Sequence, residues 1–343
     1  MAALDEVKQP ERPKLRDIMG PGLITGASDD DPSGIATYSQ VGAQFGFGLG
    51  WTLVLTFPLM AAIQEIAARI GRVTGLGIAG NLRKYYPAWL LDAMVALLIL
   101  ANVINIGADL GAMGAALKLL IGGPSQLYVV GFAIVSVLLE VFVRYSRYVS
   151  VLKYLTLSLL AYVATVFVVG TPWLQVLHDI VLPPLSLNKD YVLAIAAVLG
   201  TTISPYLFFW QAEEEVEDEH EKPLKQPLVD APRQAPGELF RIRVDTVIGM
   251  ALSNIVALFI VVTTAATLHA HGVTDIETSA QAAEALRPIA GPYAFVLFAA
   301  GIIGTGLLAM PVLAGSAAYA LGEAMGWQVG LAKKARQIGR AHV

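Results

Sequence analysis

The chain of 343 residues is 56% apolar and only 15% charged, with a formal net charge of −4. A soluble domain carries about 25% charged residues, so this composition excludes an ordinary soluble protein and indicates a helical protein that crosses a membrane several times. The mean hydropathy of +0.63 agrees with that class. The absence of cysteine excludes disulfides and thiolate metal sites.

Eight apolar segments of membrane-spanning length follow a tail at residues 1–17, which mixes both charge signs and has no signal-peptide core. Helices are predicted, in chain order, over residues 18–44, 50–70, 88–117, 126–143, 150–170, 190–210, 244–268 and 292–322. With a cytoplasmic N-terminus, 19 Lys and Arg residues up to Arg336 lie on the inner side, and only Lys118, Lys189 and Arg287 lie outside. The positive-inside rule therefore predicts a multi-pass protein of the cytoplasmic membrane with its N-terminus in the cytoplasm.

Two of the predicted connections carry unusual side chains. The predicted cytoplasmic loop 211–243 contains the run EEEVEDE at residues 213–219. Such a run is compatible with a mouth that collects metal ions, but we predict a solvated acidic stretch. The predicted outer loop 269–291 contains His269 and His271, and two neighbouring loop histidines are only a weak indication of a metal site.

The predicted first helix is interrupted by polar residues. Its sequence TGASDDDPSGIATYSQ, residues 25–40, places Asp29, Asp30 and Asp31 directly before Pro32. A proline inside a helix costs about 3 kcal/mol, and a charged side chain at mid-membrane costs at least about 2.5 kcal/mol. Backbone of this kind must line a polar cavity enclosed by protein rather than face lipid. We therefore predict a broken helix rather than a simple proline kink.

The predicted sixth helix carries a second interruption. Its sequence LGTTISPYLFFWQ, residues 199–211, has Thr201, Ser204 and Pro205 near its middle. Breaks in the first and sixth helices fit two inverted repeats of five helices, whose discontinuous helices meet at a substrate site in mid-membrane. Oxygen ligands alone, with no Cys or His at either break, favour a hard cation. The predicted domains are a first repeat at 18–170, an incomplete second repeat at 171–331 and a truncated end at 332–343.

The chain ends on QIGRAHV, which resembles the translation of a sequencing adapter. Residues 338–343 are therefore predicted to be artefactual and are left out of the fold prediction. The reading frame is then expected to stop after the eighth helix, without a ninth and a tenth.

The segments GPGLITGASDDDPSGIATYSQVGAQFG and AIAAVLGTTISPYLFFWQ resemble the two broken helices of the Nramp (natural resistance-associated macrophage protein) family. The resemblance continues through INIGADLGAMGAAL and RIRVDTVIGMALSN and extends over about residues 18–325. It implies an all-α, amino-acid-transporter-like fold of two inverted five-helix repeats. It also implies inward transport of divalent metals by alternating access, usually with protons.

The resemblance carries the family's metal site onto this chain only in part. Asp31 stands where the family has its aspartate ligand, and Gly34 stands where it has an asparagine ligand. Thr201, Ser204 and Tyr206 replace the alanine, methionine and histidine of the sixth helix. The predicted metal ligands are Asp31, Ser28, Gly34, Thr201 and Ser204. Pro32 and Pro205 are predicted to mark the helix breaks.

These replacements change the expected metal preference. Loss of the thioether removes the soft ligand that helps to select manganese or iron over magnesium, and a glycine at position 34 is expected to widen the pocket. The chain therefore resembles the Nramp-related magnesium-transporter branch, although Asp31 with carbonyl oxygens would also accept Mn²⁺. Asp29, Asp30 and Tyr206 are predicted as outer-sphere or vestibule residues, with helix capping as the alternative for the two aspartates.

The resemblance also bears on proton coupling. Asp109 matches an aspartate of the family's third helix, whereas Ala112 replaces the glutamate that follows it and Tyr206 replaces the histidine of the sixth helix. Asp109 is predicted as a proton-carrying or gating residue, because an ionisable group within a span is functional by default. The alternative is a structural hydrogen bond to Asn102 or Asn105.

The predicted function is secondary transport of divalent cations such as Mg²⁺, Mn²⁺ and Fe²⁺, with the metal as substrate and no resident cofactor. The alternative is a transporter of an amine or amino-acid solute on the same fold, since three aspartates disfavour an anionic substrate group but tolerate an amine. No nucleophile–base pair or HExxH motif is found, so an enzyme is not predicted. The predicted partners are the metal ion and the lipid bilayer, with no nucleic acid and no obligate protein partner.

Overall fold

The chain folds into helices joined by turns. The computed structural model describes residues 20–142, 156–221, 225–327 and 329–330, and no strand occurs within them. The helices are α2 (Pro21–Asp29), α3 (Pro32–Phe45), α4 (Gly50–Thr74), α5 (Ile78–Tyr85), α6 (Ala88–Ile121), α7 (Ser125–Phe142), α9 (Leu160–Val168), α10 (Trp173–Val181), α11 (Lys189–Thr202), α12 (Pro205–Glu221), α13 (Ala235–Thr267) and α14 (Ser279–Met325). Short 3-10 helices lie at Thr156–Leu159, Pro232–Gln234 and His269–His271.

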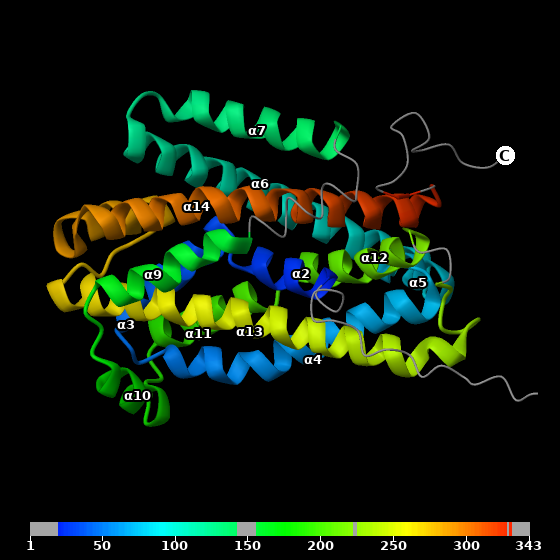
Figure 1. Ribbon diagram of the computed structural model, residues 1–343, viewed down its shortest axis with the longest axis horizontal. Helices are drawn as coiled ribbons and strands as arrows, with labels where there is room; N and C mark the ends of the chain where they lie inside the picture. Colours follow the sequence, from blue (N-terminus) through cyan, green and yellow to red (C-terminus); the bar gives the residue numbers. More distant parts are fainter. Residues whose placement is uncertain (1–19, 143–155, 222–224, 328, 331–343) are drawn as a thin grey trace, which may run out of the picture.

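The long helices lie side by side in one bundle, as Figure 1 shows, with α6 packed between α14 and α7. Among the described residues, six helical segments are long and apolar enough to cross a membrane, and the bent pair α9–α10 makes a seventh if it is one span. The predicted first span is α2 followed by α3. It is not among the six because every stretch of it long enough to span includes all three aspartates.

The predicted all-α membrane fold is confirmed, and each predicted span corresponds to a helix. The fifth predicted span, 150–170, is described only from residue 156. The predicted tail at 1–17 and the predicted truncated end at 332–343 lie outside the described residues. A division into two repeats stays a prediction.

The broken helix formed by α2 and α3 lies in the middle of the bundle, against α13 and α14 (Figure 1). All nine residues of α2 are buried. On α6, by contrast, Leu97, Leu100 and Val103 are exposed along one face, as expected where lipid tails cover a helix. Protein rather than lipid therefore surrounds the interrupted backbone.

The acidic run at residues 213–219 lies on a helix, so the prediction of a solvated loop over 211–243 is wrong. Helix α12 continues to Glu221, and α13 already begins at Ala235. Five glutamates of the run are at most 5% exposed, namely Glu213, Glu214, Glu215, Glu217 and Glu219.

Arg72 at the end of α4 supplies part of the physical reason for this burial. Its side chain is fully buried, and its Nη1 lies 3.0 Å from Glu219 Oε2. The same guanidinium donates to Gln226 O at 2.5 Å and Gln234 Oε1 at 2.9 Å, and its Nε lies 3.4 Å from Glu238 Oε2. A planar fork of five donors can hold several acceptors at once. Arg72 thereby fixes the connection between α12 and α13 onto α4.

Helix α14 is longer than predicted and bends. The prediction of a helix over 292–322 misses its first part, because α14 begins after Thr278 and continues through the non-helical Gly291, whose φ is 83° and ψ 174°. Thr278 and Gln281 form a capping box, which starts the helix inside the predicted outer loop 269–291.

The two histidines of that loop contact main-chain carbonyls. His269 Nδ1 lies 2.9 Å from Ala43 O, and His271 Nδ1 lies 2.7 Å from Thr267 O. Both contacts fasten the ends of α3 and α13, so each ring has a structural partner.

Asp245 of α13 caps the beginning of α2. Its carboxylate accepts hydrogen bonds from the main-chain N–H groups of Gly20 at 2.9 Å, Gly22 at 2.8 Å and Leu23 at 3.2 Å. These are donors that a helix N-terminus leaves without partners, and a negative charge suits the positive end of the helix dipole. Asp245 is only 1% exposed, so water does not replace it.

Glycines bring α2 and α13 into direct backbone contact. A Cβ on Gly26 of α2 would overlap the Gly249 carbonyl, and a Cβ on Gly249 would overlap the Gly22 carbonyl. Any larger residue at these positions would push the two helices apart.

We expect Gly249→Ala to lower the free energy of unfolding by about 1–3 kcal/mol, the usual cost of overpacking. Gly107→Ala is the matched control, because it also adds a methyl to a helical glycine but meets no described atom within 4 Å. Thermal unfolding in detergent compares the two, and equal midpoints would contradict the backbone contact between α2 and α13.

Candidate metal-ion site

The first break separates α2 from α3 at Asp31. This residue has extended backbone (φ −69°, ψ 165°) and is the N-cap of α3, since its Oδ1 accepts from Gly34 N at 2.6 Å and from Ser33 Oγ at 2.7 Å. Pro32 takes the first helical position, where its missing N–H costs no hydrogen bond. The capping role considered for the two preceding aspartates is therefore performed by Asp31.

The second break separates α11 from α12. Helix α11 ends at Thr202, and α12 begins at Pro205. Between them, Ser204 Oγ donates to Thr201 O at 2.8 Å and to Gly200 O at 3.2 Å. The serine thus satisfies carbonyls that the end of a helix leaves free.

Ser28 occupies the equivalent place at the end of α2. Its Oγ donates to Ile24 O at 2.9 Å and to Thr25 O at 3.0 Å. In both serines the hydroxyl hydrogen is used within the helix, while the oxygen lone pairs remain able to accept or to ligate.

The two breaks lie next to each other, as the inverted-repeat prediction requires. Tyr206 at the start of α12 donates through its hydroxyl to Ser28 O at 3.0 Å and lies 3.4 Å from Asp31 Oδ2. Thr201 Oγ1 lies 3.5 Å from Thr37 Oγ1 of α3. Asp31 and Tyr206 are each 3% exposed, so their contact is inside the protein.

Asp109 of α6 joins the first break. Its Oδ1 accepts a hydrogen bond from Ser33 N at 3.1 Å, and the residue is fully buried. The alternative of a hydrogen bond to Asn102 or Asn105 is wrong, because Asp109 Oδ2 has no partner among the described residues and Asn102 Nδ2 donates to Leu313 O at 2.9 Å. Asp109 thus contacts the opened backbone of α3 directly.

Asp29 and Asp30 point into the protein rather than into an open vestibule. Asp29 is 1% exposed, and its Oδ2 accepts from Ser253 Oγ of α13 at 2.7 Å. Asp30 is fully buried, and neither of its carboxylate oxygens has a hydrogen-bond partner among the described residues. Such groups need a proton, a cation or water to remain buried.

The space beside Gly34 is smaller than the sequence suggests. A Cβ at this position would lie 3.1 Å from Thr201 Cγ2 and 3.2 Å from both Asp29 O and Asp31 Oδ1. The threonine methyl thus occupies room that a longer side chain at position 34 would need. The expected widening of the pocket at Gly34 is therefore largely offset by Thr201.

Neutral oxygens must supply most of any coordination here. Across the ranges that the structure describes, no three His, Asp or Glu side chains are arranged to hold a metal ion. Asp31 is the carboxylate at the junction of the breaks, and the other predicted ligands (Ser28, Gly34, Thr201 and Ser204) offer hydroxyl or carbonyl oxygens. This donor set suits a hard cation that keeps some of its water.

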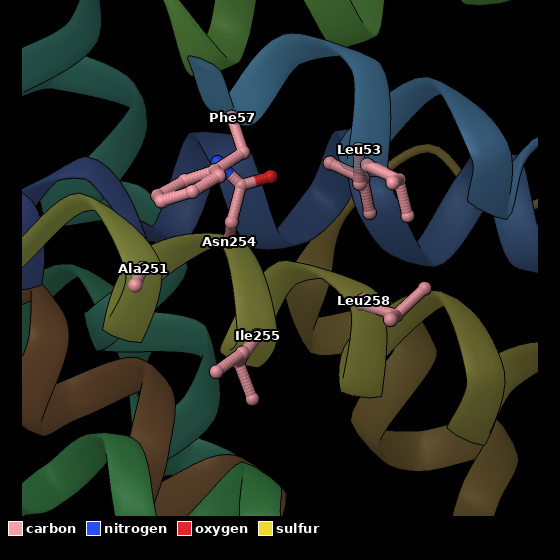
Figure 2. Close-up of a pocket in the computed structure, with 7 residues that line it drawn as sticks. Leu53, Phe57, Ala251, Asn254, Ile255 and Leu258 are labelled. Atoms are coloured by element: carbon pink, nitrogen blue, oxygen red, sulfur yellow. The ribbon is translucent and has the colours of Figure 1, made fainter. Parts of the chain in front are cut away.

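An apolar cavity of about 230 Å³ lies away from this junction, between α4 and α13 (Figure 2). Asn254 is the one polar side chain in its lining, and its Nδ2 is engaged with Met60 Sδ at 3.1 Å. The cavity contains none of the predicted site residues, so it is not the candidate metal site. Its lining consists of Leu53, Val54, Phe57, Ala251, Asn254, Ile255 and Leu258.

Two residues that touch the broken helix were not predicted, and both lie on α13. Asp245 caps α2 and Ser253 binds Asp29. With Gly249 they form a stripe at i, i+4 and i+8, which is one face of a helix. A charged, a small and a hydroxyl residue on one face of an apolar helix is a signal that could have identified the face toward α2.

Two discontinuous helices that meet at a buried carboxylate define a fold of the secondary-transporter class. A crystal structure of an Eremococcus coleocola manganese transporter, in complex with an aromatic bis-isothiourea substituted compound, has this fold as well. It matches with a TM-score of 0.75 over 94% of this chain and 70% of that chain, at 19% sequence identity.

The chain belongs to the Nramp family, since the family profile described as natural resistance-associated macrophage protein-like matches residues 22–343. A relative from Yersinia enterocolitica is 30% identical over 298 residues, which cover 84% of this chain and 68% of the relative. One from Aeromonas hydrophila is 29% identical over 297 residues, covering 84% and 69%. Both are named divalent metal cation transporter MntH.

Proposed function

We propose that the chain transports divalent metal cations across the cytoplasmic membrane by alternating access and moves them into the cytoplasm. The observation that carries this proposal is the buried Asp31 carboxylate, which lies where two broken helices meet. Freed carbonyls, hydroxyls and one carboxylate at such a junction form a site for a hard cation. The names of the two relatives support the same substrate class.

The proposed substrates are Mg²⁺ and Mn²⁺. Ser204 replaces the thioether of the family motif, so the soft ligand that would discriminate against magnesium is missing at this position. Ser28, Thr201 and Ser204 supply neutral oxygens, and Asp31 supplies the charge. An ion that retains part of its hydration shell is the substrate that this donor set suits best.

The proposed orientation places the N-terminus of α2 and the C-terminus of α12 at the cytoplasmic side. This side is closed, since α2 is buried along its whole length and is held by Asp245. On the other side of the breaks, Ser33, Thr37 and Thr201 are partly exposed. The site is therefore proposed to be reached from outside in this conformation.

The test is a competition assay in proteoliposomes. We expect a Mn²⁺ tracer to enter vesicles that contain the protein, and excess Mg²⁺ to reduce this entry more strongly than excess Ca²⁺. Protein-free vesicles are the control. Inhibition by an amine or amino acid, without inhibition by Mg²⁺, would favour the solute transporter and contradict the proposal.

Proton coupling is expected to be weak. Ala112 and Tyr206 stand where the family has two of its ionisable residues, which leaves Asp109 alone of the three, with Oδ1 accepting from Ser33 N and Oδ2 without a partner among the described residues. Lowering the external pH by about two units gives a hundredfold proton gradient. This gradient is expected to change the rate of Mn²⁺ uptake less than twofold. Proton influx that depends on added metal, recorded with an internal pH dye, would contradict the expectation of weak proton coupling.

A further inference from the structure

The buried acidic run of α12 has one face that is neutralised by cations. Glu215 forms an ion pair with Arg241 of α13, and Glu219 forms one with Arg72 of α4. Lys225 completes this side, with Nζ 2.8 Å from Asp218 Oδ2. Burial of these carboxylates is therefore accounted for by charge pairing.

The other face of α12 carries Glu213 and Glu217 and packs against α14 and α5. Tyr319 of α14 donates its hydroxyl to Glu217 Oε1 at 2.7 Å. Glu213 is 2% exposed, and its Oε1 is buried without a hydrogen-bond partner in the described part of the chain. Among the described residues, no Lys or Arg forms an ion pair with Glu213, which distinguishes it from Glu215 and Glu219.

Glu323 of α14 meets Glu213 at the beginning of α5. Its two carboxylate oxygens accept from Gly77 N at 2.8 Å and from Gly80 N at 2.7 Å, and thereby cap the first turn of α5. A Cβ placed on Gly77 would overlap Glu213 Oε1 and lie 2.7 Å from Glu323 Oε2. Both carboxyl groups therefore lie against the same glycine, next to each other.

In the described part of the chain, the charged and titratable groups around this pair are acidic or already engaged. Glu214 and Glu217 of α12 and Tyr319 of α14 lie on the near side. Arg83 of α5 donates to the main-chain oxygen of Glu323 at 3.4 Å rather than to its carboxylate. On α4, Arg72 is held by Glu219 and its neighbours. Glu213 is buried beside the partly exposed Glu323, and among the described residues no Lys or Arg forms an ion pair with either carboxylate, so ionisation of both at once is disfavoured.

We propose that Glu213 is a proton-binding site at the cytoplasmic end, which holds one proton beside ionised Glu323 while α12, α14 and α5 are packed together. The proton is assigned to Glu213 because Glu323 already accepts two main-chain N–H hydrogen bonds at the beginning of α5. When this end opens to water, the proton passes from the Glu213 carboxyl group to water, and no other bond changes. The two carboxylates then repel each other and oppose closure.

A proton rather than a metal ion is the ligand that fits. The carboxyl groups of Glu213 and Glu323 converge on Gly77, and the described residues contain no group of three His, Asp or Glu side chains placed to hold a metal ion. The proton site itself stands on this geometry. Its consequence, that a higher cytoplasmic pH speeds opening toward the cytoplasm, rests on the proposed transport function.

The experiment is infrared difference spectroscopy of the metal-free, full-length protein in detergent, recorded between low and high pH. We expect a carboxylic C=O band that disappears as pH rises, that is missing in Glu213→Gln, and that titrates at lower pH in Glu323→Gln. Glu277→Gln, at an exposed glutamate, is the matched control and is expected to keep the band. A wild-type band that Glu213→Gln leaves unchanged would overturn the proposal.

Two further measurements separate this proposal from the proposed function. In an Asp31→Ala background, Mn²⁺ binding that disappears with Glu213→Gln would show a metal site and overturn the proton assignment. In proteoliposomes, Glu213→Gln is expected to remove the dependence of uptake on internal pH. If wild-type vesicles take up no metal but the infrared band behaves as described, the transport function is wrong and the proton site stands. Should Glu213→Gln fail to fold, the shift in Glu323→Gln decides.

Discussion

Asp31→Asn is expected to reduce Mn²⁺ uptake by about 100-fold or more, because loss of a buried charge partner costs about 3 kcal/mol or more. Asparagine caps a helix about as well as aspartate. The N-cap contacts of residue 31 with Gly34 N and Ser33 Oγ should therefore be kept. The measurement is the initial rate of tracer entry into proteoliposomes. This substitution therefore isolates the charge of the site from its structural role.

Asp31→Ala removes both the charge and the cap. We expect the same loss of uptake, together with a decrease of about 0.5–2 kcal/mol in the free energy of unfolding. Asp275→Asn removes one charge at an exposed aspartate and serves as the control. It is expected to leave both the uptake and the free energy of unfolding unchanged. Normal uptake in either Asp31 variant would reject Asp31 as a metal ligand.

Asp245→Ala is expected to release the N-terminal end of α2. Three main-chain N–H groups, those of Gly20, Gly22 and Leu23, lose their acceptor in a buried place. Each buried donor left without a partner costs about 1–3 kcal/mol, so the closed arrangement should lose at least about 3 kcal/mol relative to an open one. That corresponds to a shift of about 100-fold in the ratio of closed to open molecules.

The measurement uses the absence of cysteine in the chain. A single Thr25→Cys substitution places a thiol on α2, at a residue that is fully buried in the closed arrangement. Its reaction with a maleimide should be about 100-fold faster beside Asp245→Ala, and accelerated less beside Asp245→Asn, which keeps one acceptor oxygen. Equal rates in all three backgrounds would mean that Asp245 does not hold α2 closed.

The membrane spans and both helix breaks could be predicted from the sequence because each depends on local composition. Long apolar segments have few alternatives to a helix in lipid, and Pro32 and Pro205 each stand beside a cluster of polar residues within such a segment. Proline alone does not mark a break, since Pro58 lies inside α4 and Pro311 inside α14. The bend of α14 was missed for a related reason. A glycine such as Gly291 can end a helix or bend it, and the sequence alone does not decide between the two.

The burial of the acidic run could not be predicted, because its partners are far away in sequence. Arg72 comes from α4 and Arg241 from α13, and neither is a neighbour of residues 213–219 along the chain. For the same reason Asp109 was compared with Asn102 on its own helix, whereas its partner is Ser33 N on α3. Local charge patterns show which groups need partners but do not show which distant elements provide them.

The guanidinium of Arg72 has a mechanical consequence. It contacts the last turns of α12 and the first turn of α13 from its own place on α4, and this group of contacts is buried. These three segments are therefore expected to move together as one rigid body. Helix α2 lies outside this group of contacts but packs directly against α13 through Gly26 and Gly249 and is capped by Asp245. Entry of water to the middle of the molecule from this end therefore requires α2 either to separate from α13 or to move together with it.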